Sequence, residues 1–195
     1  TTDQRYITEG QTFQDILQNK FKENSKNIYV ANVGIDGQST FGHIKNLDSV
    51  IEIGGGYGCM ASIFNKIDKN IDYTIFDLPE VNLLAYYYLE SLNIDCGINS
   101  VNKNINLLSD IKLIQKKFDM HQNENKNTLL IANWSLSEMP IKLRLKLEHL
   151  IKNCTYGIIS FQSKFEEISN IDYFNKLQKE LGNTYVSDIK HLDQM

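Results

Sequence analysis

The pattern with the most potential for chemistry is an acid and four glycines that follow a short apolar run. Residues 49–58 read SVIEIGGGYG, and their candidate cofactor-binding positions are Glu52, Gly54, Gly55, Gly56 and Gly58. Glycine lets the backbone turn sharply and lets a ligand approach where a Cβ would collide. A buried strand that runs into such a turn is where doubly wound α/β domains hold a nucleotide-like cofactor. The alternative is a tight turn without a ligand.

The glycine spacing and a second acid bear on the kind of cofactor. The dinucleotide fingerprint G-x-G-x-x-G would need glycine at position 59, which is Cys59, so the spacing disfavours NAD and an oxidoreductase. Asp77 ends a β-branched and aromatic run at 73–76, about twenty residues after the turn. At the end of a second strand, its carboxylate can accept hydrogen bonds from both ribose hydroxyls of an adenosine. The alternative role is a helix cap, but Pro79 favours the first helical position and makes Leu78 the cap residue.

A third segment places polar side chains after another expected strand. Residues 129–132 are continuously apolar, as in a strand covered on both faces. The polar residues that follow are Asn133, Ser135, Ser137 and Glu138. Because open α/β sheets bind ligands at the carboxyl ends of their strands, these residues are candidates to line a cofactor and an acceptor. Loop and capping chemistry is the alternative.

The elements that must position these residues alternate between strand and helix. A strand at 156–161 and helices at 141–152 and 173–181 continue the pattern, and 184–189 is expected to form one arm of a hairpin. In the helix after Asp77, the expected buried face consists of Val81, Leu84, Ala85, Tyr88 and Leu92. Arg144 is expected on a solvated face of the helix at 141–152, with binding of an anionic acceptor as the alternative. The predicted fold is α/β, with a Rossmann-like, doubly wound and mostly parallel sheet.

Taken in order, EIGGGYG, DLPEVNLLAYYYL and NWSLSEMP resemble the sugar O-methyltransferases of bacterial polysaccharide gene clusters, over residues 47–195. The resemblance implies a class I methyltransferase domain, truncated at its C-terminal hairpin, with S-adenosylmethionine as cofactor and a small-molecule or glycan acceptor in the cytoplasm. It places the glycine-turn residues, Asp77 and Asn133 at the cofactor. Because a sugar hydroxyl is weakly acidic, a general base is expected. We predict Glu138 for this role, ahead of His121 and His191. A non-catalytic module that binds S-adenosylmethionine is the alternative.

The first 46 residues form a different unit. NVGIDGQSTFGHI resembles the early α–β segment of SGNH-type hydrolases, with Gly34 at an oxyanion-donor position. The nucleophilic serine is missing, so we expect an esterase remnant without activity, and a fragment or fusion. Because one α–β unit cannot bury both faces, we expect it to dock on the main sheet, with 29–33 as an added edge strand, and not to form an independent domain.

Composition narrows the range of partners. A net charge of −4 argues against a nucleic-acid surface. Three widely spaced cysteines, Cys59, Cys96 and Cys154, fit reduced thiols and predict no metal site. No apolar run is long enough for a membrane span. The tyrosines at 86–88 are expected to pack within the fold, with stacking on a sugar or on another protomer of a homo-oligomer as the alternative.

Overall fold

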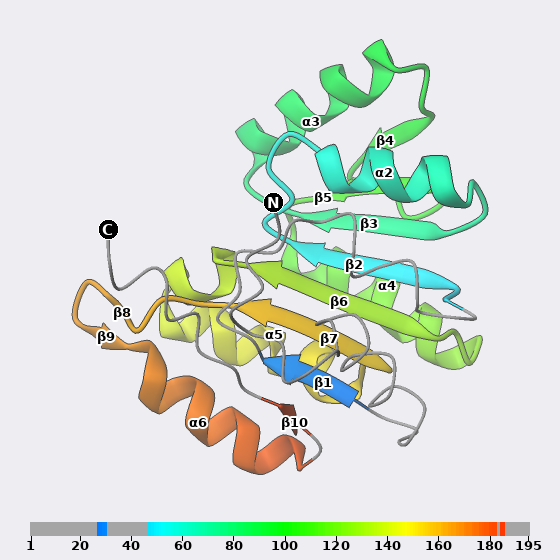
Figure 1. Cartoon of the computed structure of the whole chain (residues 1–195). Helices are drawn as coiled ribbons and strands as arrows, with labels where there is room; N and C mark the ends of the chain where they lie inside the picture. Colours follow the sequence, from blue (N-terminus) through cyan, green and yellow to red (C-terminus); the bar gives the residue numbers. More distant parts are fainter. Residues whose placement is uncertain (1–26, 31–46, 183, 186–195) are drawn as a thin grey trace, which may run out of the picture.

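A parallel β-sheet organises the protein (Figure 1). The computed structural model describes residues 27–30, 47–182 and 184–185, and for 27–30 and 185 only the backbone. Within these residues the sheet has eight strands in the order β10-β1-β7-β6-β2-β3-β5-β4. They are β1 (Asn27–Val30), β2 (Ser49–Ile53), β3 (Asp72–Phe76), β4 (Cys96–Ile98), β5 (Ile105–Leu108), β6 (Thr128–Asn133), β7 (Tyr156–Ser160) and β10 (Thr184–Tyr185). All seven neighbouring pairs are parallel. A separate antiparallel hairpin joins β8 (Lys164–Phe165) to β9 (Ile168–Ser169).

Helices cover both faces of this sheet. They are α2 (Cys59–Ile67), α3 (Pro79–Ser91), α4 (Ile111–Asn123), the 3₁₀ turn η3 (Ser135–Glu138), α5 (Ile141–Asn153) and α6 (Asn170–Leu181). The helices α2 and α3 bury Phe64 and Leu89 in one apolar core, whereas α4, α5 and α6 share the other, with Phe118, Leu147 and Phe174. The predicted doubly wound α/β fold is therefore confirmed.

The chain order creates a switch point beside β2. From β2 the chain passes to β3, then to the outer strand β4, and then to β5, which lies between β3 and β4. It then crosses to β6, on the other side of β2. Because all these strands are parallel, the loops that follow β2, β3, β5 and β6 meet at one edge of the sheet. In open α/β sheets this crevice is the usual ligand site.

The two ends of the described chain differ from the expected arrangement. Strand β1 is not at the edge of the sheet, because it lies between β7 and β10 and pairs with both. Strand β10 runs parallel to β1, so 184–185 is not an arm of an antiparallel hairpin. Residues 31–46, with Gly34, and residues 186–195, with His191, lie outside the described residues.

Two expectations about buried helix faces were wrong. In α3, Ala85 is buried as predicted, together with Asn82 and Leu89, whereas Leu84 and Leu92 are 58% and 39% exposed. Arg144 is fully buried instead of lying on a solvated face of α5. In both helices the inward positions include a polar residue with hydrogen-bond partners, which an apolar pattern cannot reveal.

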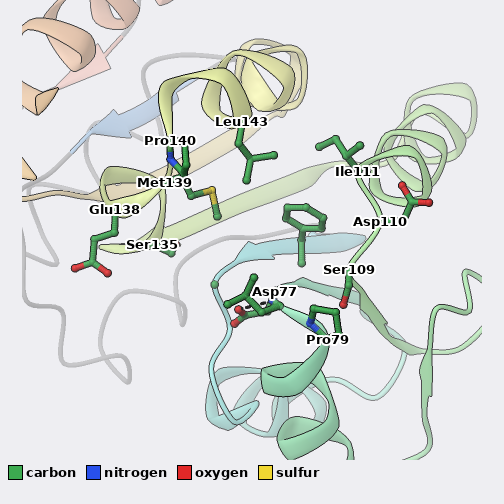
Figure 2. A pocket seen from close by; sticks show the side chains of 13 residues that line it. Asp77, Pro79, Ser109, Asp110, Ile111, Ser135, Glu138, Met139, Pro140 and Leu143 are labelled. Carbon is green, nitrogen blue, oxygen red and sulfur yellow. Dashed lines mark hydrogen bonds between the residues drawn. The ribbon is translucent and has the colours of Figure 1, made fainter. Parts of the chain in front are cut away.

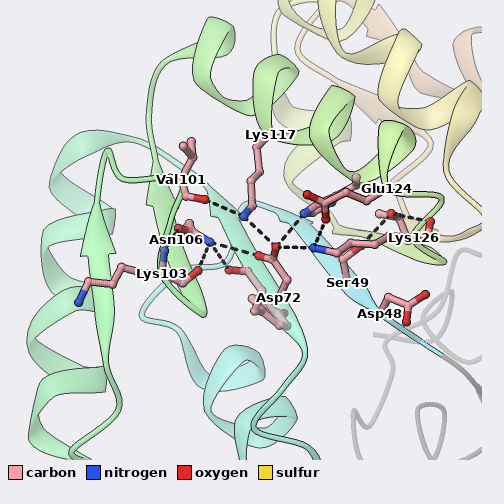
Figure 3. A network of polar contacts seen from close by, with 12 residues as sticks. Asp48, Ser49, Asp72, Val101, Lys103, Asn106, Lys117, Glu124 and Lys126 are labelled. Atoms are coloured by element: carbon pink, nitrogen blue, oxygen red, sulfur yellow. Dashed lines mark hydrogen bonds and ion pairs between the residues drawn. The ribbon is translucent and has the colours of Figure 1, made fainter.

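A network of charged side chains lies at the opposite edge of the sheet, at the start of β3 (Figure 3). Asp72 Oδ2 accepts from Lys117 Nζ at 2.8 Å and from Lys126 Nζ at 3.3 Å, and lies 3.1 Å from His121 Nε2. Burial alone would raise the pKa of Asp72, but the bonds from His121 and Lys117 lower it to about 2. His121 is thus held at the amino end of the strands, away from the switch point, and it is no longer a candidate for the general base.

Candidate functional site

A pocket of about 750 Å³ opens at the carboxyl edge of the sheet (Figure 2). Each of the four loops at the switch point contributes to its wall. The lining residues are Gly54, Phe76, Asp77, Leu78, Pro79, Ser109, Asp110, Ile111, Ser135, Glu138, Met139, Pro140 and Leu143. The volume is in the usual range for small-molecule sites, about 300–1,000 Å³. The wall is mainly apolar, with three carboxylates and no basic side chain among the described residues.

Gly54 is where the loops after β2 and β6 touch. It has φ +78°, and a Cβ at this position would lie 2.1 Å from Cβ of Ser135. Ser135 Oγ in turn donates a hydrogen bond to the carbonyl of Ile53. Only glycine permits this contact, so the close approach of the two loops explains why the glycine run begins here.

The remaining glycines shape the turn into α2. Gly56 has φ +56°, and an added Cβ would meet no atom within 4 Å, so its backbone borders open space. A Cβ on Gly55 would lie 2.7 Å from Ile75 and 2.9 Å from Glu52 Oε2. Gly58, with φ +88°, is the N-cap of α2, which has no side-chain cap and no acid in its first turn. No side chain of the N-cap or of the first turn therefore compensates the positive end of the α2 dipole.

Asp77 connects the glycine turn to the start of α3. Its Oδ2 accepts from the Gly56 amide at 3.0 Å, and its Oδ1 accepts from the Leu78 amide at 2.8 Å. Leu78 is the N-cap residue and Pro79 the first residue of α3, as predicted. Each carboxylate oxygen keeps lone-pair capacity for a further donor, so Asp77 can serve both the turn and a ligand hydroxyl.

Asn82 contacts the backbone at Asp77, and the sequence analysis did not select it. It is fully buried in α3, and its Nδ2 donates to the Leu108 carbonyl and to Ser109 Oγ, both at 2.9 Å, and lies 3.3 Å from the Asp77 carbonyl. The amide thus joins the loops after β3 and β5. No spacing rule indicates such a bond, because a polar residue in a helix usually faces solvent.

Glu52 lies buried beneath the glycine turn. It is 6% exposed, and Tyr73 Oη donates to its Oε2 at 2.8 Å. Burial raises the pKa of Glu52 to about 7, with a smaller rise from the charge of Asp77, against the lowering effect of the Tyr73 bond. The pKa of Tyr73 is itself raised by burial and by the nearby Glu52. Glu52 is not among the residues that line the pocket, so any effect it has on a ligand passes through the turn.

The segment after β6 carries the predicted catalytic residue. Trp134 has φ +65°, which is unusual for a bulky residue, and it sharply redirects the chain into η3. Glu138 ends this turn, is exposed and lines the pocket, and its Oε1 lies 3.4 Å from Gln162 Nε2. Asn133, at the end of β6, is not in the pocket wall, and its Oδ1 accepts from Ser160 Oγ at 3.1 Å. Of the predicted residues, Gly54, Asp77, Ser135 and Glu138 therefore meet at the pocket, whereas Ser137 is not in its wall.

The loop after β5 supplies lining residues that the sequence analysis did not select. Ser109 and Asp110 follow β5 directly, and Ile111 begins α4. Asp110 caps α4 by accepting from the Lys112 amide at 2.8 Å, while it also borders the pocket. The signal was available, because polar residues after a third parallel strand reach the same edge as the other two loops.

The described residues contain no group of three or more His, Cys, Asp and Glu side chains arranged to hold a metal ion. Within the same residues, no helix is both long enough and apolar enough to cross a lipid bilayer. Of the three cysteines, Cys96 and Cys154 are buried and Cys59 is partly exposed.

Comparison with known proteins finds solved structures with a similar fold, but no match to a family or to a curated sequence. Similar solved structures include the mitomycin 7-O-methyltransferase MmcR, with 14% identity, a TM-score of 0.40, and coverage of 72% of this chain and 39% of that one. Another is PigF, solved with SAH, with 12% identity, a TM-score of 0.35, and coverage of 70% and 43%. This chain therefore spans about two fifths of the length of these two proteins.

Proposed function

We propose that this chain is an S-adenosylmethionine-dependent O-methyltransferase, whose pocket takes the cofactor and a small acceptor that carries a hydroxyl group. The observation that carries the proposal is the meeting of the glycine turn and Asp77 at the switch point of the sheet, beside a pocket of about 750 Å³. The order of the motifs supports it, because an acid, closely spaced glycines and an acid after the next strand suit an adenosine-containing ligand.

The residues present fit such a cofactor. The open backbone at Gly56 leaves room for a ligand to lie on the turn, and the carboxylate of Asp77 can accept from two ribose hydroxyls. The uncapped amino end of α2 suits the carboxylate of the methionine part. Leu78 and Ile111 offer apolar surface for the base. These residues would hold the cofactor, and Glu52 would support the turn beneath it.

When bound, S-adenosylmethionine supplies a methyl group that is activated by a positively charged sulfur. The protein's own task is then to align the acceptor and to take up the proton of its hydroxyl. Glu138 is our choice for that base, because it is the carboxylate on the loop after β6 and it lines the pocket. The exposed position of Glu138 leaves it free to approach an acceptor that enters from solvent.

We further propose that the acceptor is a sugar hydroxyl of a bacterial surface polysaccharide or of its precursor. The support for this finer step is the motif resemblance and the chemistry of the wall. Asp77, Asp110 and Glu138 are hydrogen-bond acceptors, which suit a ligand rich in hydroxyl groups. We also propose that residues 47–195 belong to one methyltransferase domain and that residues 1–46 are not an independent domain.

Calorimetric titration tests the cofactor step. We expect the wild type to bind S-adenosylmethionine and S-adenosylhomocysteine, and Asp77→Ala to bind both at least about a hundredfold more weakly, because two hydrogen bonds to a charged group are lost. Asp119→Ala removes an exposed acid on α4 and is the matched control, with unchanged affinity expected. Circular dichroism verifies that each variant is folded.

Two outcomes would contradict parts of the proposal. A folded wild type that binds neither compound would refute the cofactor site. Binding without methyl transfer to nucleotide sugars, glycans or phenols would favour the alternative of a non-catalytic module that binds S-adenosylmethionine. Transfer to phenols alone would refute the sugar acceptor and leave the methyltransferase intact.

A further inference from the structure

Arg144 is the charged side chain with the least solvent exposure among the described residues. This residue of α5 is fully buried, and no acidic side chain of the described residues forms an ion pair with it. Its guanidinium makes three hydrogen bonds. Nε donates to the Met139 carbonyl at 2.7 Å, Nη2 to the Ser137 carbonyl at 2.6 Å, and Nη1 to Asn170 Oδ1 at 2.6 Å.

These contacts are what offsets the loss of water around the cation. An unpaired buried charge is costly, and burial lowers the pKa of Arg144 while the nearby Tyr173 raises it. The Arg144 Cζ also lies 5.1 Å from the centre of the Tyr173 ring, within the range of a cation–π contact. Two of the three hydrogen bonds go to backbone carbonyls of one short segment, so the compensation is concentrated there.

That segment is the wall of the pocket. Ser137 and Met139 are the neighbours of Glu138, so Arg144 holds the peptide groups on both sides of the proposed base. Figure 2 shows Ser135, Glu138, Met139 and Pro140 together on one side of the pocket. The turn is unusual in its backbone, since it begins at Trp134 with φ +65°, and an external hold is needed to keep such a conformation.

We propose that Arg144 is a positioning residue for this site: its guanidinium fixes the Ser135–Glu138 turn against the pocket and ties it to α6 through Asn170. The part of this inference that concerns catalysis rests on the proposed function, which names Glu138 as the base. The part that concerns the position of the pocket wall rests only on the hydrogen bonds of Arg144. Lysine cannot take over the role, because a single ammonium group does not present donors in a planar fork.

Asn170 can be substituted so that its hydrogen bond with Arg144 is either kept or removed. Its Oδ1 accepts from Arg144, whereas its buried Nδ2 has no hydrogen-bond partner among the residues that the structure describes. Asn170→Asp therefore keeps the acceptor, gives up no bond and adds a charge opposite to that of Arg144. Asn170→Ala removes the acceptor and leaves the other two bonds in place.

The experiment compares Arg144→Lys and Asn170→Asp with the wild type, with Lys146→Ala, an exposed position on α5, as control. Trp134 is the chain's single tryptophan and begins the turn, so acrylamide quenching of its fluorescence reports on the turn alone. Titration with S-adenosylhomocysteine reports on the pocket, and urea unfolding reports on global stability. We expect Arg144→Lys to raise the quenching constant and to weaken binding about tenfold. Asn170→Asp and Lys146→Ala should stay within about twofold of wild type in both.

The outcomes distinguish this inference from the proposed function. If Arg144→Lys lowers the urea midpoint but leaves quenching and affinity unchanged, Arg144 is only structural and the inference is overturned. If the wild type does not bind S-adenosylhomocysteine, the proposed function fails, while quenching still decides the role of Arg144. Should Arg144→Lys not fold, the uncharged Arg144→Gln takes its place, and an unchanged quenching constant in that folded variant overturns the inference. Asn170→Ala tests the tie to α6 alone, because both bonds to the turn remain, and unchanged quenching there overturns that tie.

Discussion

The buried carboxyl of Glu52 makes stability depend on pH in a direction opposite to that of most acids. Its pKa in the folded protein is about 7, against 4.5 for the unperturbed group. The folded state therefore binds this proton more tightly than the unfolded state does. Stability from Glu52 is fully present below the unfolded pKa, near 4.5, and is lost as the pH rises through about 7.

Glu52→Gln isolates this contribution. Glutamine resembles the protonated acid in shape, and its Oε1 can still accept from the Tyr73 hydroxyl, so the two proteins should be about equally stable near pH 5. With each pKa unit worth about 1.4 kcal/mol, the wild type should lose about 2.5 kcal/mol relative to the variant between about pH 5 and about pH 8. Groups common to both proteins cancel in the difference.

Urea unfolding at a series of pH values measures this difference. The control is Glu90→Gln, an exposed acid on α3, whose stability profile should run parallel to that of the wild type. If Glu52→Gln also runs parallel to the wild type between about pH 5 and about pH 8, the carboxyl is ionised throughout, and the reasoning from its burial is refuted.

Two further substitutions address the turn and the proposed base. Gly54→Ala should cost about 1–2 kcal/mol for its positive φ and about 1–3 kcal/mol more for the overlap with Ser135, whereas Gly56→Ala, with open space around it, should cost the first amount alone. Equal urea midpoints for the two variants would contradict the close approach at Gly54. Glu138→Gln should slow methyl transfer about 10²–10⁴-fold while calorimetry gives an unchanged cofactor affinity. A variant with normal turnover would remove Glu138 from the role of base.

The parts of the fold that could be predicted are those set by local chemistry. The apolar strand before Gly54, the cap at Leu78 and the proline that follows it each depend on a few neighbouring residues, and each is found where predicted. The meeting of Gly54, Asp77 and Glu138 also follows, because parallel strands bring their carboxyl ends to one edge.

The parts that could not be predicted depend on partners far along the chain. Asn82 and Arg144 are buried because carbonyls from other elements satisfy them, and neither partner is visible from a helical pattern. His121 is likewise held by Asp72, at the wrong edge of the sheet for catalysis. The position of β1 between β7 and β10 could not be read from its own residues, because strand neighbours are chosen by the whole sheet.

The place of β1 in the sheet has a consequence for synthesis on the ribosome. Asn27 pairs with Tyr156, which follows it by 129 residues (156 minus 27). At about 5–20 residues per second, β1 is complete on the order of ten seconds before β7 emerges, and β10 follows later still. During this interval β1 has neither of its native neighbours, so this half of the sheet forms late and its strand edges stay unpaired longest.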